Sequence, residues 1–545
     1  MRLVSRLPEL EIPNKTFHDY IFDEFAKYGD NVAMISNDTK MQYTYHDLME
    51  RAKYIARALV YLGVEKGEVV LLVMDNSPEC IYIPLGISMA GAAVQVTSPK
   101  LQAGEMRFPV EQSESRFVFS DPLGLKEITK LMRTLDREHR IVCTGAREYA
   151  EGYPILADLE YAVNQIRPFP TIDPQRDMVY LPFSSGIHGK RKGILTTHEV
   201  MVAKTVIAQN KDHYHQFAKG DYTVTMLPFH KQMGFEAMLI ALLNGVTVIT
   251  EKNFCVHTML TLVQRYKVRS VHLTPMIMGM MAFESQNHEY EIDSLEWVVS
   301  GSEAISEELF DEFQEAFPSA KNVVQTYGMT EVGLITRSDP LQKYSTSCGH
   351  LAANLELKVV DICTGDELGP NQKGQIFVKG LAACSPYLNN HEATVEHFLE
   401  GWRKTGDIGY FDENEELYIV DKVKEMIKVF GYQVIPSEIE TLIMTHPAVA
   451  EAAVVAITND VSGERPVAFV VLKPDHQVNA DEIKDYVNKR VIRYKHLVQV
   501  NIAQTLPRSA CGTLLRRLLA EAAVLSVACL SDIEKSVIAY PHCAE

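Results

Sequence analysis

Short apolar runs alternate with helix-length segments along most of the chain, and this alternation constrains the fold more than any other feature. The strand-like runs include EVVLLVM, GAAVQV, RFVFSD, VTMLPF, GVTVIT, SVHLTP, EWVVSG and NVVQTYG. Alternation of this kind is typical of parallel sheets that are covered by helices on both faces. The sequence therefore predicts an α/β fold, with parallel-rich sheets flanked by helices.

One of the helices can be delimited from residue types alone. Thr44 can cap a helix, with Asp47 three residues further on, and Gly63 can end it. The apolar face expected between these limits consists of Leu48, Ala52, Ile55, Leu59 and Leu62.

The length of 545 residues predicts more than one domain, because single hydrophobic cores stop growing at roughly 250–300 residues. The sequence changes character near residue 420, where a compact α+β pattern with a helix beginning at Asn479 follows. We therefore expect a large N-terminal domain over residues 1–420 and a small, mobile α+β domain over residues 421–518. Residues 519–545 form an extension of unknown role. Their sequence is typical of a packed helix followed by an unstructured terminus.

Composition narrows the class of protein. The formal charge is 53 − 71 = −18 with no concentrated basic stretch, which argues against nucleic-acid binding. The nine cysteines include no CxxC pair, which is typical of a reducing compartment. The apolar runs at 80–96 and 237–249 are shorter than the roughly 20 residues of a membrane span. With no apolar signal segment and a C-terminal HCAE in place of a Ser-Lys-Leu address, we expect a cytoplasmic protein.

The segment SSGIHGKRKG, from Ser184 to Gly193, follows a strand-like run and is rich in glycine and hydroxyl groups. Backbone N–H groups in such a loop can close around phosphate oxygens, and lysine adds positive charge. The spacing does not fit a Walker A motif. Taken alone, the segment is equally typical of a glycine-rich surface turn.

Two further segments carry polar chemistry. In QTYGMTE, Tyr327 can face a purine ring, Thr330 can donate to phosphate, and Glu331 can hold Mg²⁺. In the block from Gly401 to Glu440, Asp407 follows a Thr-Gly turn and can accept hydrogen bonds from ribose hydroxyls.

The order and spacing of these blocks resemble the adenylate-forming family of 4-coumarate–CoA ligases, acyl-CoA synthetases and beetle luciferases. The similarity runs from about residue 15 to about residue 517. It includes NSPEC and MAGAAVQVTSPKL near the start and GERPVAFVVLK near the end. The resemblance implies two half-reactions that use ATP, Mg²⁺ and CoA. A carboxylic acid first forms an acyl-adenylate and pyrophosphate, and the CoA thiol then displaces AMP.

The resemblance also implies roles for individual residues. The nucleotide-binding residues are Ser184, Ser185, Gly186, Gly189 and Lys192 of the phosphate loop, Ser302, Glu303 and Ala304 of SGSEA (Ser300–Ala304), Gln325, Tyr327 and Gly328, and Asp407 and Lys422. The residues of the chemical steps are His230 along the acyl pocket and CoA route, Thr330 at the α-phosphate, Glu331 at Mg²⁺ and Lys428 in the thioester step, with a hinge at Asp421–Lys424. His230 is also compatible with a packed core histidine, and Lys428 with a solvated lysine.

The chain departs from the family pattern at several places. In LPRSACGTLLRR, Thr513 occupies the position of a lysine that, in the family, bridges the acyl carboxylate and the charge developing at phosphorus. Loss of one such donor typically costs about 10²–10³ in rate. Ile187 and His188 replace small hydroxyl residues in the phosphate loop, and Lys422 replaces an arginine.

Three functions remain open at this point. The first is an ATP-dependent carboxylate–CoA ligase whose adenylation step is impaired by Thr513, and which uses a preformed acyl-adenylate better than it makes one. The second is a weakened relative that binds nucleotide or acyl ligand without efficient turnover. The third is a luciferase-like oxygenase. The sequence predicts neither the acid nor the oligomeric state.

Overall fold

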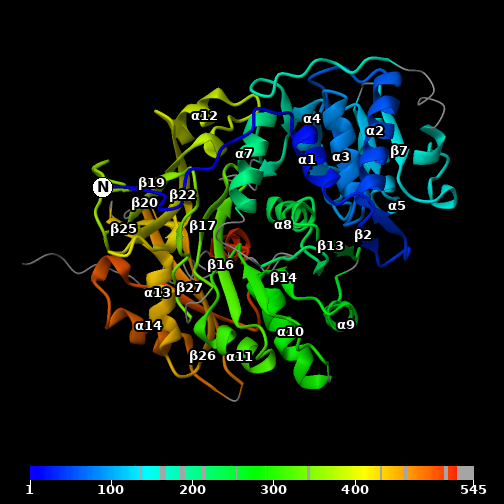
Figure 1. Cartoon of the computed structure of the whole chain (residues 1–545). Helices are drawn as coiled ribbons and strands as arrows, with labels where there is room; N and C mark the ends of the chain where they lie inside the picture. Colours follow the sequence, from blue (N-terminus) through cyan, green and yellow to red (C-terminus); the bar gives the residue numbers. More distant parts are fainter. Residues whose placement is uncertain are drawn as a thin grey trace, which may run out of the picture. The chain divides into compact units, whose positions relative to one another are not determined.

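The computed structural model describes residues 1–135, 138–159, 167–184, 191–210, 216–252, 254–288, 290–340, 344–429, 432–459, 463–474, 476–508 and 514–524 (Figure 1). The chain divides into two compact units. The first consists of Met1–Gln372, Ile376–Thr405 and Phe411–Tyr418, and the second of Lys373–Gln375, Gly406–Tyr410 and Ile419–Glu545. The predicted fold of a large α/β part and a small α+β part is present. No helix among the residues described is long and apolar enough to cross a membrane.

One sheet of the first unit has six strands and is parallel except for its edge strand β11. In spatial order the strands are β11 (Thr196–Thr197), β8 (Met178–Tyr180), β5 (Ala93–Thr97), β4 (Val69–Val73), β6 (Phe117–Ser120) and β7 (Arg140–Cys143). Val70 and Leu72 of β4 pack in one core cluster, whereas Leu71 and Val73 pack in another. Because successive side chains of a strand point to opposite faces, helices cover both faces of this sheet. These helices are α2 (Tyr45–Tyr61) and α3 (Glu79–Met89) with one cluster, and α4 (Ala103–Ser113) and α5 (Pro122–Thr134) with the other.

Helix α2 has the limits that its sequence predicts. The Thr44 side chain accepts a hydrogen bond from the Asp47 N–H, and the Asp47 carboxylate accepts one from the Thr44 N–H, which completes a capping box. Gly63 has a φ of 87°, a conformation that glycine adopts readily, and the helix ends just before it. Of the predicted face, only Leu62 is half-buried rather than buried. Helix α2 lies beside α3 (Figure 1).

Two further sheets of the first unit are mixed rather than purely parallel. One has the order β12 (Tyr222–Thr225), β13 (Thr247–Thr250), β2 (Val32–Ser36) and β3 (Gln42–Thr44). The other has the order β14 (Ser270–Leu273), β15 (Trp297–Ser300), β16 (Asn322–Met329), β17 (Gly333–Arg337) and β18 (His350–Leu351). The antiparallel pairs are β2–β3, β16–β17 and β17–β18. In each of the first two the chain returns after a short connection, and such a connection permits only antiparallel pairing.

The remaining elements of the first unit complete its layers. The helices are α1 (Phe17–Ala26), α7 (His198–Gln209), α8 (Gln232–Leu243), α9 (Val256–Tyr266), α10 (Pro275–Asn287), α11 (Glu307–Ala316) and α12 (His391–His397). The short strands β9 (Phe183–Ser184) and β10 (Lys192–Gly193) pair with each other. A further sheet, in which parts of β20, β22 and β23 belong to the second unit, contains β1 (Arg2–Val4), β19 (Glu356–Val360), β20 (Gly374–Lys379), β22 (Trp402–Phe411), β21 (Phe398–Leu399) and β23 (Leu417–Lys422).

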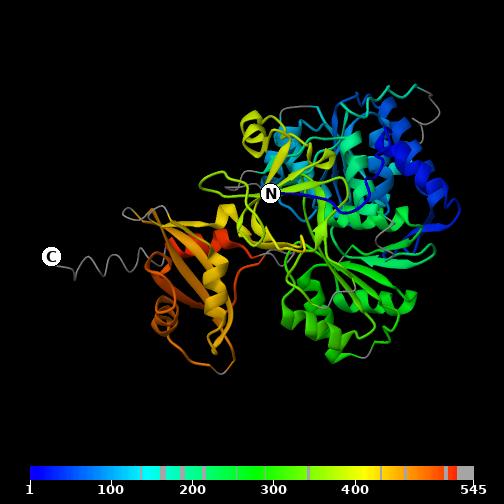
Figure 2. The same ribbon diagram turned by 60° about the vertical axis from the view of Figure 1, so that its left-hand side comes forward.

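The described part of the second unit contains a five-stranded sheet with helices packed against it (orange in Figure 2). The strands follow the order β25 (Tyr432–Val434), β24 (Ile427–Val429), β27 (Gly463–Leu472) and β26 (Val449–Asn459), and β28 (Gln499–Ala503) also pairs with β27. The helices are α13 (Pro436–Met444) and α14 (Ala480–Asn488), and Asn479 caps α14 as predicted. Residues 516–524 are helical, and Leu519 and Ala523 are buried in a cluster with strands β26 and β27. The predicted domain limits and the role of the extension stay predictions, and residues 525–545 lie outside the described part.

Candidate active site

The turn between β16 and β17 carries two of the predicted catalytic residues. Strand β16 ends at Met329, Thr330 and Glu331 form the turn, and β17 begins at Gly333. A Cβ atom at Gly328 would lie only 2.3 Å from the carbonyl oxygen of Gly333, so only glycine permits this close approach of the two strands. The tight hairpin thereby fixes the positions of Thr330 and Glu331 at the end of the sheet.

Glu331 is buried, and a tyrosine that the sequence analysis missed holds it in place. The hydroxyl of Tyr387 donates to Oε1 of Glu331 at 3.0 Å. The ammonium of Lys192 lies 4.8 Å from the centre of the Tyr387 ring, and its Nζ is 2.8 Å from Nε2 of His397. Burial lowers the pKa of Lys192 below its usual range. Tyr387 therefore brings together two predicted residues, Lys192 of the phosphate loop and Glu331.

Two buried cations that the sequence analysis also missed lie near this turn. Lys204 of α7 is only 3% exposed, and its Nζ donates to the backbone carbonyl of Thr330 at 3.1 Å. Arg403 of β22 is fully buried, with Nε and Nη2 donating to the carbonyls of Ala383 and Ser385. Burial lowers the pKa of Lys204 to about 8. The turn thus lies in a region of positive charge, which suits the binding of an anionic group.

The segment Ser300–Ala304 and the strand that carries Gln325 are tied together. The Thr326 hydroxyl donates to the Ser300 carbonyl at 3.1 Å, and Oε1 of Gln325 accepts from the Ile305 N–H at 3.1 Å. Ser302 has a φ of 76°, and Ser302 and Ala304 are exposed while Glu303 is half-buried. The structure therefore places the two predicted adenine-side segments next to each other. Their contacts with a nucleotide stay predictions.

His230 lies just before α8, in a loop that Asn76 holds by accepting from the Phe229 N–H and donating to the Leu227 carbonyl. Burial lowers the pKa of the half-buried His230 to about 4, and the charge of Lys231 acts in the same direction. The imidazole is therefore neutral at pH 7. Its predicted place along the acyl pocket stays a prediction.

In the second unit, Asp407 and Lys422 lie together. Nζ of Lys422 is 3.4 Å from Oδ1 of the buried Asp407, and the charge of Asp407 raises the pKa of Lys422. Asp421, at the predicted hinge, accepts from the N–H groups of Lys422 and Ser437. Lys428 is exposed on β24, and its N–H donates to Glu464. Lys424 belongs to a short 3₁₀ turn.

The arginines near position 513 are all paired with carboxylates. Arg508 contacts Glu451 at 2.9 Å, and Arg517 contacts Glu521 at 3.2 Å. Nε of Arg516 is 2.6 Å from Glu425, and its Nη1 is 2.5 Å from Glu440. Six residues that the sequence analysis named lie outside the described part of the chain: Ser185, Gly186, Ile187, His188, Gly189 and Thr513.

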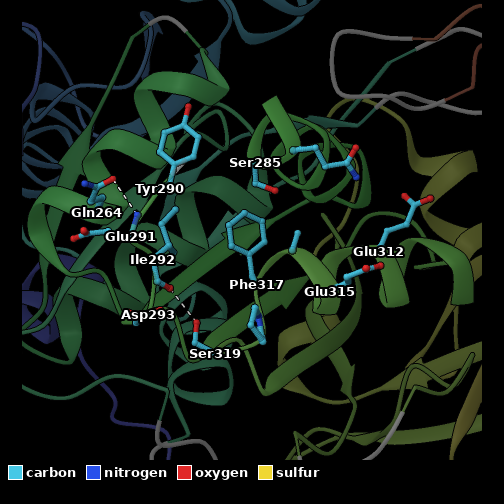
Figure 3. A pocket seen from close by; sticks show the side chains of 13 residues that line it. Gln264, Ser285, Tyr290, Glu291, Ile292, Asp293, Glu312, Glu315, Phe317 and Ser319 are labelled. Atoms are coloured by element: carbon cyan, nitrogen blue, oxygen red, sulfur yellow. Dashed lines mark hydrogen bonds between the residues drawn. The ribbon is translucent and has the colours of Figure 1, made fainter. Parts of the chain in front are cut away.

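A wide hollow of about 890 Å³ lies elsewhere on the first unit (Figure 3). Its lining includes Phe317, Tyr290 and four acidic residues, namely Glu291, Asp293, Glu312 and Glu315, and none of the predicted site residues. An acidic lining repels phosphate groups, so this hollow does not suit a nucleotide. Within the described residues, no group of three or more His, Cys, Asp or Glu side chains is arranged to hold a metal ion.

Comparisons with known proteins find matches to one family along nearly the whole chain. Residues 21–388 match the family model described as AMP-binding enzyme, and residues 438–513 match the AMP-binding enzyme C-terminal domain. The chain is 34% identical over 531 residues to 4-coumarate–CoA ligase 1 of Arabidopsis thaliana, covering 94% of each chain. It is 33% identical to 4-coumarate–CoA ligase 2 of Nicotiana tabacum, covering 94% of this chain and 95% of the relative.

Solved structures share the fold. ATP-bound MatB from Rhodopseudomonas palustris superposes with a TM-score of 0.82 at 23% identity, covering 94% of this chain and 99% of that chain. The anthranilate–CoA ligase AuaEII in complex with anthranoyl-AMP superposes with a TM-score of 0.79 at 24% identity, covering 95% and 99%. At these identities the likeness establishes the fold alone.

Proposed function

Because the chain belongs to the AMP-binding family of adenylate-forming CoA ligases, we propose that it joins a carboxylic acid to CoA with a weakened first half-reaction. In that step a carboxylate oxygen attacks the α-phosphorus of ATP, and the bond to pyrophosphate breaks. In the second step the CoA sulfur attacks the acyl carbonyl carbon, and AMP leaves with the electrons of the acyl–oxygen bond.

The observation that carries this proposal is the anchored turn of Thr330 and Glu331. The Tyr387 hydroxyl fixes Glu331, and Lys192 lies over the same ring. A nucleotide site of this kind needs fixed donors and positive charge, since phosphoryl chemistry relies on positioning and on electrostatic stabilisation. Both are present in the first unit.

The residues present also fit Mg²⁺, which the family implies. Proteins bind Mg²⁺ through one or two carboxylates together with substrate phosphates, rather than through all-protein cages. Glu331 offers one buried carboxylate, and Tyr387 orients it. When bound, the ion would neutralise charge on the phosphate oxygens.

In the second unit we assign Asp407 to the ribose hydroxyls and Lys428 to the thioester step. Nζ of Lys422 lies 3.4 Å from Oδ1 of Asp407 and holds that carboxylate in place. A carboxylate is an acceptor and suits two hydroxyl donors. Lys428 is exposed, so its ammonium keeps its ordinary mobility and hydration.

The weakened step is inferred from Thr513. A threonine hydroxyl is shorter than a lysine side chain and carries no charge, so it cannot bridge the two reacting groups. Arg516 is already bound to Glu425 and Glu440, and an arginine held in this way is a poor substitute. The first half-reaction therefore lacks its usual cation.

Pyrophosphate release separates this proposal from its main alternative, a protein that binds nucleotide without efficient turnover. Purified chain is incubated with ATP–Mg²⁺, CoA and a panel of cinnamic, fatty and branched acids, with cinnamic acids first because of the relatives' names. We expect slow release that depends on both the acid and CoA. A rise in melting temperature with ATP–Mg²⁺, but no release with any acid, would favour the alternative. Light or O₂ uptake would instead indicate a luciferase-like oxygenase.

A further inference from the structure

Lys204 and Arg403 are buried cations without a carboxylate partner. Lys204 is 3% exposed and Arg403 is 0% exposed. Across the described part of the chain, neither makes an ion pair with Asp or Glu, and Nη1 of Arg403 has no hydrogen-bond acceptor. Burying an unpaired charge is costly, so such a group usually has a partner that the folded protein alone does not contain.

Both cations act on the same turn from different elements. Lys204, on α7, donates to the Thr330 carbonyl, and its stem lies against Gly333, where an added Cβ would be 3.5 Å from Cγ of Lys204. The guanidinium of Arg403, on β22, is 5.4 Å from the centre of the Tyr387 ring, whose hydroxyl donates to Glu331. One positive charge therefore contacts the turn directly, and the other lies beside the ring that anchors Glu331.

Among the described residues, two carboxylates raise the pKa of Lys204 by their charge. They are Glu331 in the turn and Glu236 on α8. Glu236 accepts hydrogen bonds from the Gln232 side chain and the Leu334 N–H, but its Oε1 is buried without a partner in the described residues. Burial raises the pKa of Glu236 to about 7, so this carboxylate balances the cations only in part. The turn therefore retains positive charge for an anionic ligand.

We propose that Lys204 and Arg403 supply part of the fixed positive charge that adenylation needs in this chain, where position 513 is not a lysine. This inference rests on the proposed function. Lys204 is a positioning residue that acts through Thr330, and Arg403 is one that acts through Tyr387 and Glu331. Fixed charge in a buried site acts strongly on a developing charge, because little water screens it and no reorganisation is needed during the reaction.

The test compares Lys204→Met with Lys204→Arg in two backgrounds, the native chain and Thr513→Lys. Adenylation is followed by ATP–pyrophosphate exchange, and the second step by acyl-CoA formation from synthetic acyl-adenylate. In the native background we expect Lys204→Met to slow adenylation by about tenfold or more and to change the second step less than about twofold. Lys204→Arg keeps the charge and should retain most of the rate. In Thr513→Lys the loss should shrink to less than about threefold, because the new lysine supplies charge.

Two controls separate this result from misfolding. Lys126→Met removes an exposed lysine from α5 and should change neither step. The double variant Lys204→Met/Glu236→Gln removes the carboxylate that Lys204→Met leaves beside it, and it should show the same selective loss with a native-like melting temperature. Equal losses in both half-reactions, or the same loss in the Thr513→Lys background, would overturn the inference.

A second measurement keeps the inference testable if the ligase proposal fails. If no acid gives pyrophosphate, the shift in melting temperature on adding ATP–Mg²⁺ is compared between Lys204→Met and Lys126→Met. The inference requires a smaller shift in Lys204→Met, because tighter binding to the folded state gives a larger shift. An equal shift in the two variants would overturn it.

Discussion

Thr513→Lys is expected to raise the rate of adenylation by about 10²-fold, since one donor aimed at transition-state charge is typically worth about 10²–10³ in rate. The physical reason is the charge and reach of the lysine side chain, both of which threonine lacks. ATP–pyrophosphate exchange with an accepted acid measures the step directly. The second half-reaction, started from synthetic acyl-adenylate, should stay within about twofold of the native rate.

Thr513→Met is the matched control for this variant, because it restores much of the side-chain length without the charge. It should leave adenylation near the native rate. If Thr513→Met accelerates adenylation as much as Thr513→Lys, the charge is not what the native chain lacks. If neither variant changes the rate, another group already supplies the charge in full, and adenylation is not weakened at position 513.

Arg516→Met is expected to destabilise the second unit by about 2 kcal/mol, less than the 3–5 kcal/mol typical of a fully buried pair because Arg516 is partly exposed. The change removes the cation that Glu425 and Glu440 both contact, and it removes the donor to the Val454 carbonyl. Hydrogen exchange of the amides in β26 and β27 measures the stability of the second unit separately from that of the first. This is possible because the free energy of local opening can be resolved along a chain.

Arg517→Met is the control, because Arg517 makes an exposed pair with Glu521 on the same helix and such pairs contribute little. Faster exchange in Arg516→Met but not in Arg517→Met would support a structural role for Arg516. A selective loss of adenylation in Arg516→Met, with unchanged exchange, would mean that Arg516 has replaced the missing lysine. The proposed weakening at Thr513 would then be wrong.

Local sequence patterns predicted the features of the fold that depend on neighbouring residues. The capping box of Thr44 and Asp47 involves residues three positions apart, and the structure contains it. The alternation of apolar runs and helices likewise predicted strands at GAAVQV and GVTVIT, and the structure has β5 and β13 there. The hairpin of β16 and β17 was not expected, because the residue types of QTYGMTE do not distinguish a return strand from a loop.

The contacts that complete the site could not be predicted in the same way. Tyr387 and Glu331 are 56 residues apart, and Lys204 and Thr330 are 126 residues apart, so no local pattern relates them. Lys204 did carry a signal, since it is a charged residue within a helix in which seven of the other eleven residues are apolar. Arg403 lies between Trp402 and Lys404, and Thr405 and Gly406 continue the same strand instead of forming the expected turn. The full burial of Arg403 follows only from the packing of β22.

The most direct test of the weakened first half-reaction is the ratio of two rates in the native chain. Acyl-CoA formation is measured from synthetic acyl-adenylate plus CoA, and from the same acid plus ATP–Mg²⁺ and CoA. If adenylation is slow because one charged donor is missing, acyl-CoA should form at least about tenfold faster from the synthetic adenylate than from the acid and ATP. Equal and fast rates from both starting points would contradict the account, because adenylation would then be as competent as thioester formation.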